Sequence, residues 1–418
     1  MDDRLPEARR ILFVDLAPTP GGSVVSLYNL LRGLDRRRYE PLVVLSAHNT
    51  FAQQVRELGV PVVALPGHRQ GTAEFPAAVQ RVRTGRLGRW VQRAGPLLRL
   101  WRAGGLALRL ARRTLPEAWR LASVVRRTQP HLLHLNNIVA LNRAGILAAW
   151  ATGRPCVCHL RGLNRLEPVD RWLARRVAYY IFISQAVARA QRAEGVPMLG
   201  EVIANAVEPG ALDQRCSGEE LVEAFGFPPG AQVFGMVGRL EPWKGHRVFL
   251  QALAQVRRQH PQAVGLVVGG PEPNSPAYPQ ELSALARELG LGGAVVFAGY
   301  RPDVLRLMTG MAAVVHCSTA PEPFGRVIIE GMAAGVPVVA SNDGATPEIV
   351  ENGVSGLLTP PGDAAALAAA MARLLAEPAW AQRLAAQGHA VFQERYTAEQ
   401  HARQVERIYQ RLLGSGQG

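Results

Sequence analysis

Lysine is almost absent from this chain of 418 residues, because 46 of its 47 basic residues are arginine. The two side chains are nearly interchangeable on a solvated surface, but a compact ammonium fits a small site that a planar guanidinium does not. The one lysine, Lys244, stands five residues after Arg239, close behind an apolar run. We therefore treat Lys244 as a candidate functional residue, with chance survival on the surface as the alternative.

Cysteine is also scarce, which excludes a disulfide scaffold. The four cysteines are scattered, and no second pair completes a zinc site, so we expect buried free thiols. No uncharged apolar run reaches transmembrane length, and the first residues lack the basic-then-apolar order of a signal peptide. These absences predict a cytoplasmic protein.

Acidic residues are few in the first half of the chain. Residues 1–208 hold 31 arginines against 14 acids, a net charge of +17, whereas residues 209–418 hold 15 arginines and one lysine against 19 acids, a net of −3. The excess is greatest in residues 69–127, where 14 arginines face two acids and are interleaved with tryptophan and leucine. Such a segment suits anionic lipid head groups, and an ordinary solvated helical insertion is the alternative. Nucleic acid is a poor interpretation, because no known recognition pattern accompanies the charge.

Short β-branched runs alternate with amphipathic stretches along nearly the whole chain, which is typical of parallel α/β sheets. Two doubly wound, Rossmann-like domains in tandem fit better than one very large sheet. The predicted strands are 11–16, 41–46, 60–65, 131–136, 155–160, 180–184 and 201–204, then 233–237, 265–268, 295–298, 313–317, 336–340 and 356–358.

The domain boundaries follow from the same pattern. We predict an N-terminal domain over residues 1–208, with residues 69–127 as a basic helical insertion, and a C-terminal domain over residues 233–395. Residues 209–232 are rich in proline and glycine and are the predicted linker. A final helical stretch lies within residues 396–418.

Four features lie at the carboxyl ends of predicted strands, where open α/β sheets bind ligands. The first is a glycine turn containing Gly22, which opens a helix and lets backbone N–H groups approach an anion. The second is Arg239 with Lys244, two cations that can hold a diphosphate and stabilise it as it leaves. This segment is not a P-loop, because no Ser or Thr follows the lysine, which argues against Mg-dependent NTP hydrolysis.

The third feature is the segment 321–330, Pro-Glu-Pro-Phe-Gly-Arg-Val-Ile-Ile-Glu. A helix is expected to begin near Gly325, so the first amides, of Phe324, Gly325 and Arg326, suit phosphate oxygens or sugar hydroxyls. Glu322 precedes this helix. Glu330 lies more than one turn inside it, where a ribose diol would satisfy the carboxylate and a partner arginine is the structural alternative.

The fourth feature is His159, at the end of the predicted strand 155–160. A lone histidine in such a place is structural by default. We expect it to face the ligand-binding edge of the sheet, which makes a functional role an equal alternative.

Together these motifs resemble the retaining GT-B glycosyltransferases, specifically the family-four group of nucleotide-sugar-dependent enzymes. The resemblance is close over residues 233–356 and looser over the N-terminal half. Gly238-Arg239-Leu240-x3-Lys244-Gly245 is similar to the family's diphosphate clamp, and Glu322-x7-Glu330 is similar to its E-x7-E motif.

The resemblance implies a role for each site residue. Arg239 and Lys244 would bind the donor phosphates, and Glu330 would hold the ribose hydroxyls. Glu322 would lie beside the transferred sugar. The remaining contacts to the donor would come from the amides of Phe324, Gly325 and Arg326, from His159, and from the glycine loop at Gly22.

The resemblance also implies a GT-B architecture, with two Rossmann-like domains facing a central cleft and a last helix that crosses back to the first domain. The reaction would retain the anomeric configuration and would need neither metal nor cofactor. Two departures from the family pattern are Gly331, where alanine is common, and Gly344, which stands alone where two glycines are usual. The second leaves the donor preference open.

The leading hypothesis is transfer of a sugar from a nucleotide diphosphate sugar to an acceptor held by the basic domain. A lipid-linked acceptor, or a growing polysaccharide at the inner face of the membrane, would explain the charge. A nucleotide-sugar epimerase on the same fold is one alternative, and it would need no acceptor. A non-catalytic scaffold that binds membranes or polyanions is another, disfavoured because all four charged site residues are present.

Overall fold

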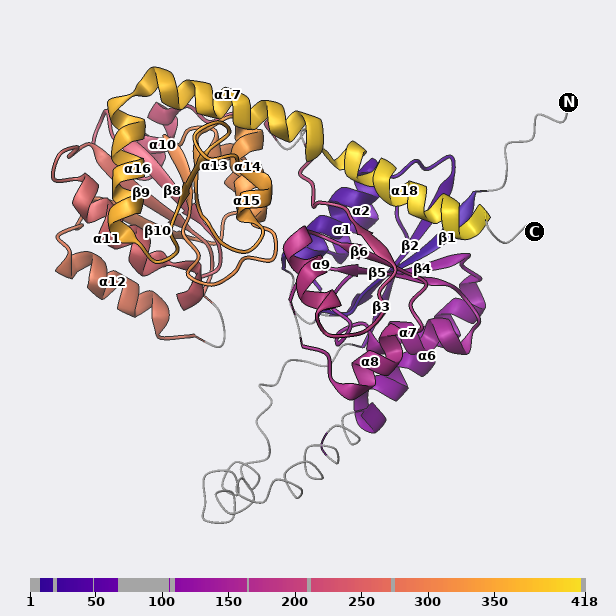
Figure 1. Cartoon of the computed structure of the whole chain (residues 1–418). Coiled ribbons are helices and arrows are strands. Elements are labelled where there is room, and N and C mark those ends of the chain that lie inside the picture. The colour runs from indigo at the N-terminus through magenta and orange to yellow at the C-terminus, as the bar shows by residue number, and fades with distance from the viewer. Residues whose placement is uncertain are drawn as a thin grey trace, which may run out of the picture. The chain divides into compact units, whose positions relative to one another are not determined.

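The computed structural model describes residues 8–17, 21–47, 49–66, 105, 110–163, 165–208, 212–271 and 275–414. The chain divides into two compact units, each built around one sheet (Figure 1). Unit 1 comprises Met1–Ile181, Gln191–Glu201 and Glu406–Gly418, and unit 2 comprises Phe182–Ala190 and Val202–Val405. The greater part of the predicted basic insertion, residues 69–104 and 106–109, lies outside the described residues.

The sheet of unit 1 has seven strands in the order β3-β2-β1-β4-β5-β6-β7. β1 pairs in parallel with β2 on one side and with β4 on the other, so the winding of the chain reverses between β1 and β4. All four residues of β4 are buried, as expected for a parallel sheet covered on both faces. The strands are β1 (Arg9–Asp15), β2 (Tyr39–Ser46), β3 (Val62–Leu65), β4 (Leu132–Leu135), β5 (Cys156–Leu160), β6 (Tyr179–Phe182) and β7 (Gly200–Val202).

Helices flank this sheet. They are α1 (Gly22–Gly33), α2 (Ala52–Glu57), α6 (Leu115–Thr128), α7 (Arg143–Ala151) and α8 (Pro168–Ala174), and a π-helical turn (Leu110–Thr114) leads into α6. The next helix, α9 (Gln185–Arg192), follows β6 and belongs to unit 2 as far as Ala190. α6 shows the pattern of a surface helix, because Leu121, Val124 and Val125 are buried on one face while Trp119 is exposed.

The sheet of unit 2 has six strands in the order β10-β9-β8-β11-β12-β13. They are β8 (Gln232–Val237), β9 (Ala263–Val268), β10 (Val295–Gly299), β11 (Ala313–His316), β12 (Val338–Ser341) and β13 (Leu357–Thr359). β8 pairs in parallel with β9 and β11, so the winding reverses between β8 and β11. In a doubly wound sheet this reversal opens a crevice at the carboxyl ends of the two strands.

The helices of unit 2 are α10 (Gly218–Ala224), α11 (His246–Val256), α12 (Tyr278–Glu288), α13 (Val304–Met308), α14 (Arg326–Ala334), α15 (Thr346–Ile349), α16 (Ala364–Ala376), α17 (Pro378–Arg395) and α18 (Ala398–Gly414), with a 3₁₀ turn at Pro242–Lys244. The core lies between the sheet and α11, α12 and α16, and includes Phe234, Phe249, Leu253, Leu282 and Met371.

The prediction of two doubly wound α/β sheets is confirmed. All thirteen predicted strands are present, and each predicted boundary lies within two residues of the observed one. The stretch 209–232, predicted as a linker, contains α10, whose Leu221 is fully buried in unit 2. The end of α18, from Glu406, belongs to unit 1, where the Tyr409 hydroxyl lies 2.6 Å from Nδ1 of His134.

Candidate functional site

The Lys244 and Glu322 side chains meet in unit 2, at the carboxyl ends of β8 and β11. Lys244 ends the 3₁₀ turn that follows β8, and Glu322 lies in the loop between β11 and α14. Nζ of Lys244 donates to Oε2 of Glu322 at 2.7 Å, and it also lies 4.0 Å from the centroid of the Trp243 ring. Two residues 78 positions apart in the sequence therefore form one ion pair at the predicted ligand-binding edge.

Two further side chains bind the same carboxylate oxygen. Nε2 of His316 and Oγ of Ser318 each lie 3.2 Å from Oε2 of Glu322, and they lie 3.1 Å from each other. Burial alone would raise the pKa of the Glu322 carboxyl, but the hydrogen bond from His316 and the charge of Lys244 outweigh burial and lower this pKa to about 2. Glu322 is therefore a buried, permanently charged acceptor.

His316 and Ser318 were not among the site residues predicted from the sequence. The available signal was a polar residue at the end of an apolar strand, followed by another two positions later, because residues i and i+2 of an extended chain lie on the same side. That spacing places both side chains toward the loop that carries Glu322.

Two glycines allow the loops of this site to approach closely. A Cβ at Gly245 would collide with the carbonyl oxygen of Cys317, and one at Gly344 would collide with the backbone of Glu322. Both glycines have positive φ, +83° and +63° respectively, which other residues rarely adopt. The backbone N–H of Ala345 donates to the carbonyl of Glu322 at 2.9 Å, so the single glycine of this loop helps to fix Glu322.

Glu330 lies where the sequence predicted, more than one turn inside α14, and is 8% exposed. Its carboxylate accepts a hydrogen bond from the Arg326 guanidinium one turn earlier. The arginine partner considered as the structural alternative is therefore present, and the ribose contact stays a prediction.

The helix α14 begins as predicted, at Arg326, with Gly325 as its N-cap. The Phe324 side chain is 4% exposed and packs edge-on against Tyr396, with ring centroids 6.3 Å apart. Within the described ranges, no backbone carbonyl accepts a hydrogen bond from the N–H groups of Phe324 and Gly325. These two donors stand at a helix N-terminus next to the Glu322 cluster.

Arg239 follows β8 but does not join the Glu322 cluster. Its guanidinium forms an ion pair with Glu241 at 2.9 Å, and its side chain is 55% exposed. The two predicted phosphate-binding cations thus lie in different surroundings, Lys244 half-buried and Arg239 in solvent.

A second segment of unit 2 supports the loop after Glu322. Oγ of Ser184 donates to the carbonyl of Pro323 at 2.7 Å. The Glu348 carboxylate accepts from the backbone N–H groups of Gln185 and Ala186, both at 2.7 Å, and so caps α9. The backbone beside Glu322 is therefore held by a residue far away in the sequence.

In unit 1, Gly22 is the first residue of α1, as predicted. A buried network holds this turn: Nδ2 of Asn136 donates to Oδ2 of Asp15 at 2.8 Å and to the carbonyl of Ser23 at 3.0 Å. Nε of Arg161 donates to Oδ1 of Asn136 at 2.8 Å. Asp15, Asn136 and Arg161 lie at or just after the ends of β1, β4 and β5, and none of them was predicted from the sequence.

The His159 ring does not face the open edge of the sheet, contrary to our expectation. It is 0% exposed, and its Nδ1 lies 3.2 Å from Nε2 of His134, whose Nδ1 contacts the Tyr409 hydroxyl. The neighbours of the ring explain the difference, because His159 lies inside β5 and packs against His134 of β4, which in turn contacts Tyr409 of α18. A contact between His159 and a donor sugar stays a prediction.

Among the described residues, no group of three His, Cys, Asp or Glu side chains is arranged to hold a metal ion. In the same part of the chain, no helix is long and apolar enough to cross a membrane.

Two sequence-family models match the chain. Residues 217–391 match the family described as Glycosyl transferases group 1, and residues 20–210 match the family described as Glycosyltransferase Family 4. The two matches lie one after the other and cover most of both units.

The chain is similar in sequence to curated D-inositol 3-phosphate glycosyltransferases. The one from Corynebacterium urealyticum is 38% identical over 201 residues, which are 46% of this chain and 46% of that protein. The one from Acidothermus cellulolyticus is 38% identical over 156 residues, 36% of this chain and 35% of that protein. The chain thus spans less than half the length of these relatives.

Solved structures match over nearly the whole chain. The crystal structure of Anabaena Alr3699/HepE in complex with UDP and glucose is 28% identical, with a TM-score of 0.76, and covers 96% of this chain and 100% of that chain. The complex of the same protein with UDP-glucose has the same identity and TM-score and covers 96% and 99%.

Proposed function

Because the chain belongs to the family-four glycosyltransferases, which have the GT-B fold, we propose that it transfers a sugar from a nucleotide diphosphate sugar to an acceptor. The observation that carries this proposal is the Lys244–Glu322 pair at the reversal point of the unit 2 sheet. A cation beside a carboxylate suits a ligand with two parts, a diphosphate that needs positive charge and a sugar whose hydroxyls need an acceptor.

Lys244 and Arg239 would neutralise the diphosphate as it becomes the leaving group. Lys244 would contribute more, because its side chain is 20% exposed against 55% for Arg239, and a charge acts more strongly in a drier site. The amides of Phe324, Gly325 and Arg326, at the start of α14, would donate to phosphate or sugar oxygens.

Glu330 would hold the ribose hydroxyls. A carboxylate has about four lone-pair sites, so it can accept from Arg326 and from a diol at the same time. Gly22 and His159 would complete the donor contacts from unit 1, as the family resemblance implies.

We further propose that the reaction retains the anomeric configuration. The acceptor would attack from the face that the diphosphate leaves, and the departing phosphate would take the proton of the acceptor hydroxyl. No metal or cofactor is assigned, since Lys244 and Arg239 would supply the charge stabilisation that a metal ion supplies in other transferases.

The first test is a thermal-shift screen of the purified chain against UDP-, GDP-, ADP- and TDP-sugars without metal, with UDP-glucose as the first probe because Anabaena HepE binds it. A ligand that binds only the folded state raises the melting temperature. One clear shift that disappears in Lys244→Ala is the expected result. No shift from any nucleotide or nucleotide sugar would contradict the proposal.

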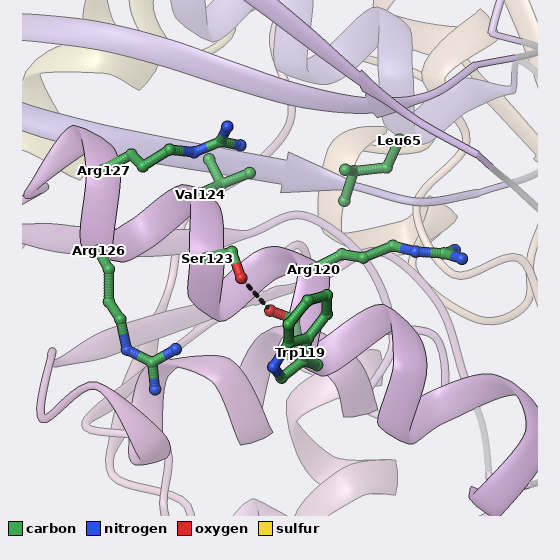
Figure 2. A pocket seen from close by; sticks show the side chains of 7 residues that line it. All are labelled: Leu65, Trp119, Arg120, Ser123, Val124, Arg126 and Arg127. Atoms are coloured by element: carbon green, nitrogen blue, oxygen red, sulfur yellow. Dashed lines mark hydrogen bonds between the residues drawn. The ribbon is translucent and has the colours of Figure 1, made fainter.

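The acceptor that we favour is lipid-linked, or a growing polysaccharide, presented at an anionic membrane surface. Its support is an open hollow of about 520 Å³ on unit 1, formed largely by α6 (Figure 2). Trp119 is 70% exposed there. The hollow is lined by Leu65, Trp119, Arg120, Ser123, Val124, Arg126 and Arg127.

Three arginines lie around this hollow. Arg120, Arg126 and Arg127 form no ion pair with any residue in the part of the chain that the structure describes. Guanidinium groups around an exposed indole match the anionic head groups and the apolar layer of a membrane. We therefore propose that the protein is peripheral at the cytoplasmic face of a membrane.

A further inference from the structure

The contacts of the Glu322 carboxylate are distributed unevenly between its two oxygens. Oε2 receives Nζ of Lys244, Nε2 of His316 and Oγ of Ser318. No described residue donates a hydrogen bond to Oε1, and Oε1 is not one of the fully buried polar atoms that lack a partner. One oxygen is therefore anchored to the protein, and the other is left accessible to a ligand.

The nitrogen of the His316 ring that donates a hydrogen bond follows from its surroundings. Nδ1 is buried, and no residue in the described ranges binds it. Nε2 faces two oxygens, so the ring proton belongs on Nε2, where it is donated to Oε2 of Glu322. The Ser318 hydroxyl can then donate to the same oxygen.

His316 and Ser318 differ from Lys244 in how firmly they hold Glu322. Both are nearly fully buried, at 5% and 1% exposed; His316 is the last residue of β11, and Ser318 follows two positions later. Lys244 holds its ammonium on a long flexible stem that is 20% exposed, and it is also the residue expected to bind the diphosphate. The two short side chains therefore form the rigid part of the anchor.

We propose that His316 is a positioning residue: with Ser318 it fixes Oε2 of Glu322 and thereby aims Oε1 at a hydroxyl of the transferred sugar. This inference rests on the proposed function for the identity of the ligand. A hydroxyl donor, and not a phosphate, is the partner of this oxygen, because an ionised carboxylate has no proton to donate and repels an anion.

The experiment compares two amide side chains of different length, glutamine and asparagine, at position 316. His316→Gln carries an N–H donor near the place of Nε2, whereas His316→Asn carries one near the place of Nδ1 and leaves Oε2 without its imidazole donor. His389→Gln is the control, because His389 is also in unit 2 but bonds the carbonyl of Met332 and not Glu322. Melting temperatures of all variants establish that they are folded.

The first measurement is affinity for UDP and UDP-glucose by calorimetry, with turnover of whichever nucleotide sugar the wild type uses. A hydrogen bond to a charged group corresponds to roughly a 10- to 100-fold effect. We expect His316→Asn to lower turnover and the preference for UDP-glucose over UDP by about this factor, with affinity for UDP nearly unchanged. His316→Gln and His389→Gln should remain close to the wild type. Equal losses in the Gln and Asn variants, or no loss in Asn, would overturn the proposal.

The second measurement does not depend on transfer activity. Lys244 is the only lysine, so labelling with ¹³C-lysine gives one set of side-chain NMR signals that report on the Glu322 carboxylate beside it. We expect these signals to shift in His316→Asn and to stay near the wild-type positions in His316→Gln. If the wild type binds no nucleotide sugar, the proposed function fails and the NMR result still decides the role of His316. Unchanged lysine signals in His316→Asn would show that Glu322 does not depend on His316.

Discussion

The Lys244–Glu322 pair should be strongly coupled, and a double-mutant cycle measures that coupling. Lys244→Met leaves the Glu322 carboxylate, 11% exposed, with His316 and Ser318 as its remaining described side-chain donors. Removing one partner of a buried pair costs about 3–5 kcal/mol, and the partial exposure of Lys244 points to roughly 3 kcal/mol. Glu322→Gln leaves an ammonium that reaches solvent more easily, so we expect about 1–2 kcal/mol.

The double variant should be less destabilised than the sum of the single variants, with a coupling of about 2 kcal/mol. Hydrogen exchange of amides in β11 and α14 is the suitable assay, because a chain with two units need not unfold in one two-state step. Protection of β4 in unit 1 serves as the internal control. Additive effects of the two substitutions, within about 0.5 kcal/mol, would refute the reasoning that these charges stabilise each other.

Four further predictions follow from the same structure. The lowered pKa of Glu322 means that its ionised carboxylate stabilises the fold by roughly 3 kcal/mol above about pH 4.5, and that this stabilisation is lost as the pH falls toward 2. The free energy of unfolding of Glu322→Gln should therefore depend less on pH over this range. Lys244→Arg should lose at least 10-fold in turnover, because a planar fork does not fit between Glu322 and a diphosphate; wild-type turnover would contradict the clamp. Glu330→Ala should weaken donor binding by roughly 10-fold in calorimetry, and unchanged affinity would refute the ribose contact. Replacing Arg120, Arg126 and Arg127 together by glutamine should reduce sedimentation with phosphatidylserine vesicles by roughly 10-fold or more, since each cation contributes about 1 kcal/mol, and undiminished binding would leave α6 as an ordinary surface helix.

The composition of the basic segment, residues 69–127, predicted the kind of partner but not the shape of the surface. Its arginine and tryptophan content predicted an anionic partner, and the described part, from Leu110 onward, has Trp119 in solvent. Which residues surround that indole depends on the packing of α6 against the rest of unit 1. Its neighbour Leu65, at the end of β3, is distant in the sequence and could not be inferred from the helix alone.

The sequence by itself determined the two sheets and singled out the principal candidate site residues. Parallel strands covered on both faces must be apolar throughout, so each strand is readable as a short β-branched run without knowledge of its neighbours. Lys244, Glu322 and Glu330 were readable for a related reason, since charges near apolar strand and helix segments have few explanations other than a ligand or a partner.

Only the tertiary structure decided which of these charges meet. The pairing of Glu330 with Arg326 and the burial of His159 against His134 depend on side-chain directions that spacing does not resolve. The same holds for His316 and Ser318, which bind the oxygen of Glu322 that also receives Lys244. Whether a polar side chain binds ligand, lies buried or anchors another residue depends on groups that folding brings within about 3 Å, and these come from distant parts of the chain.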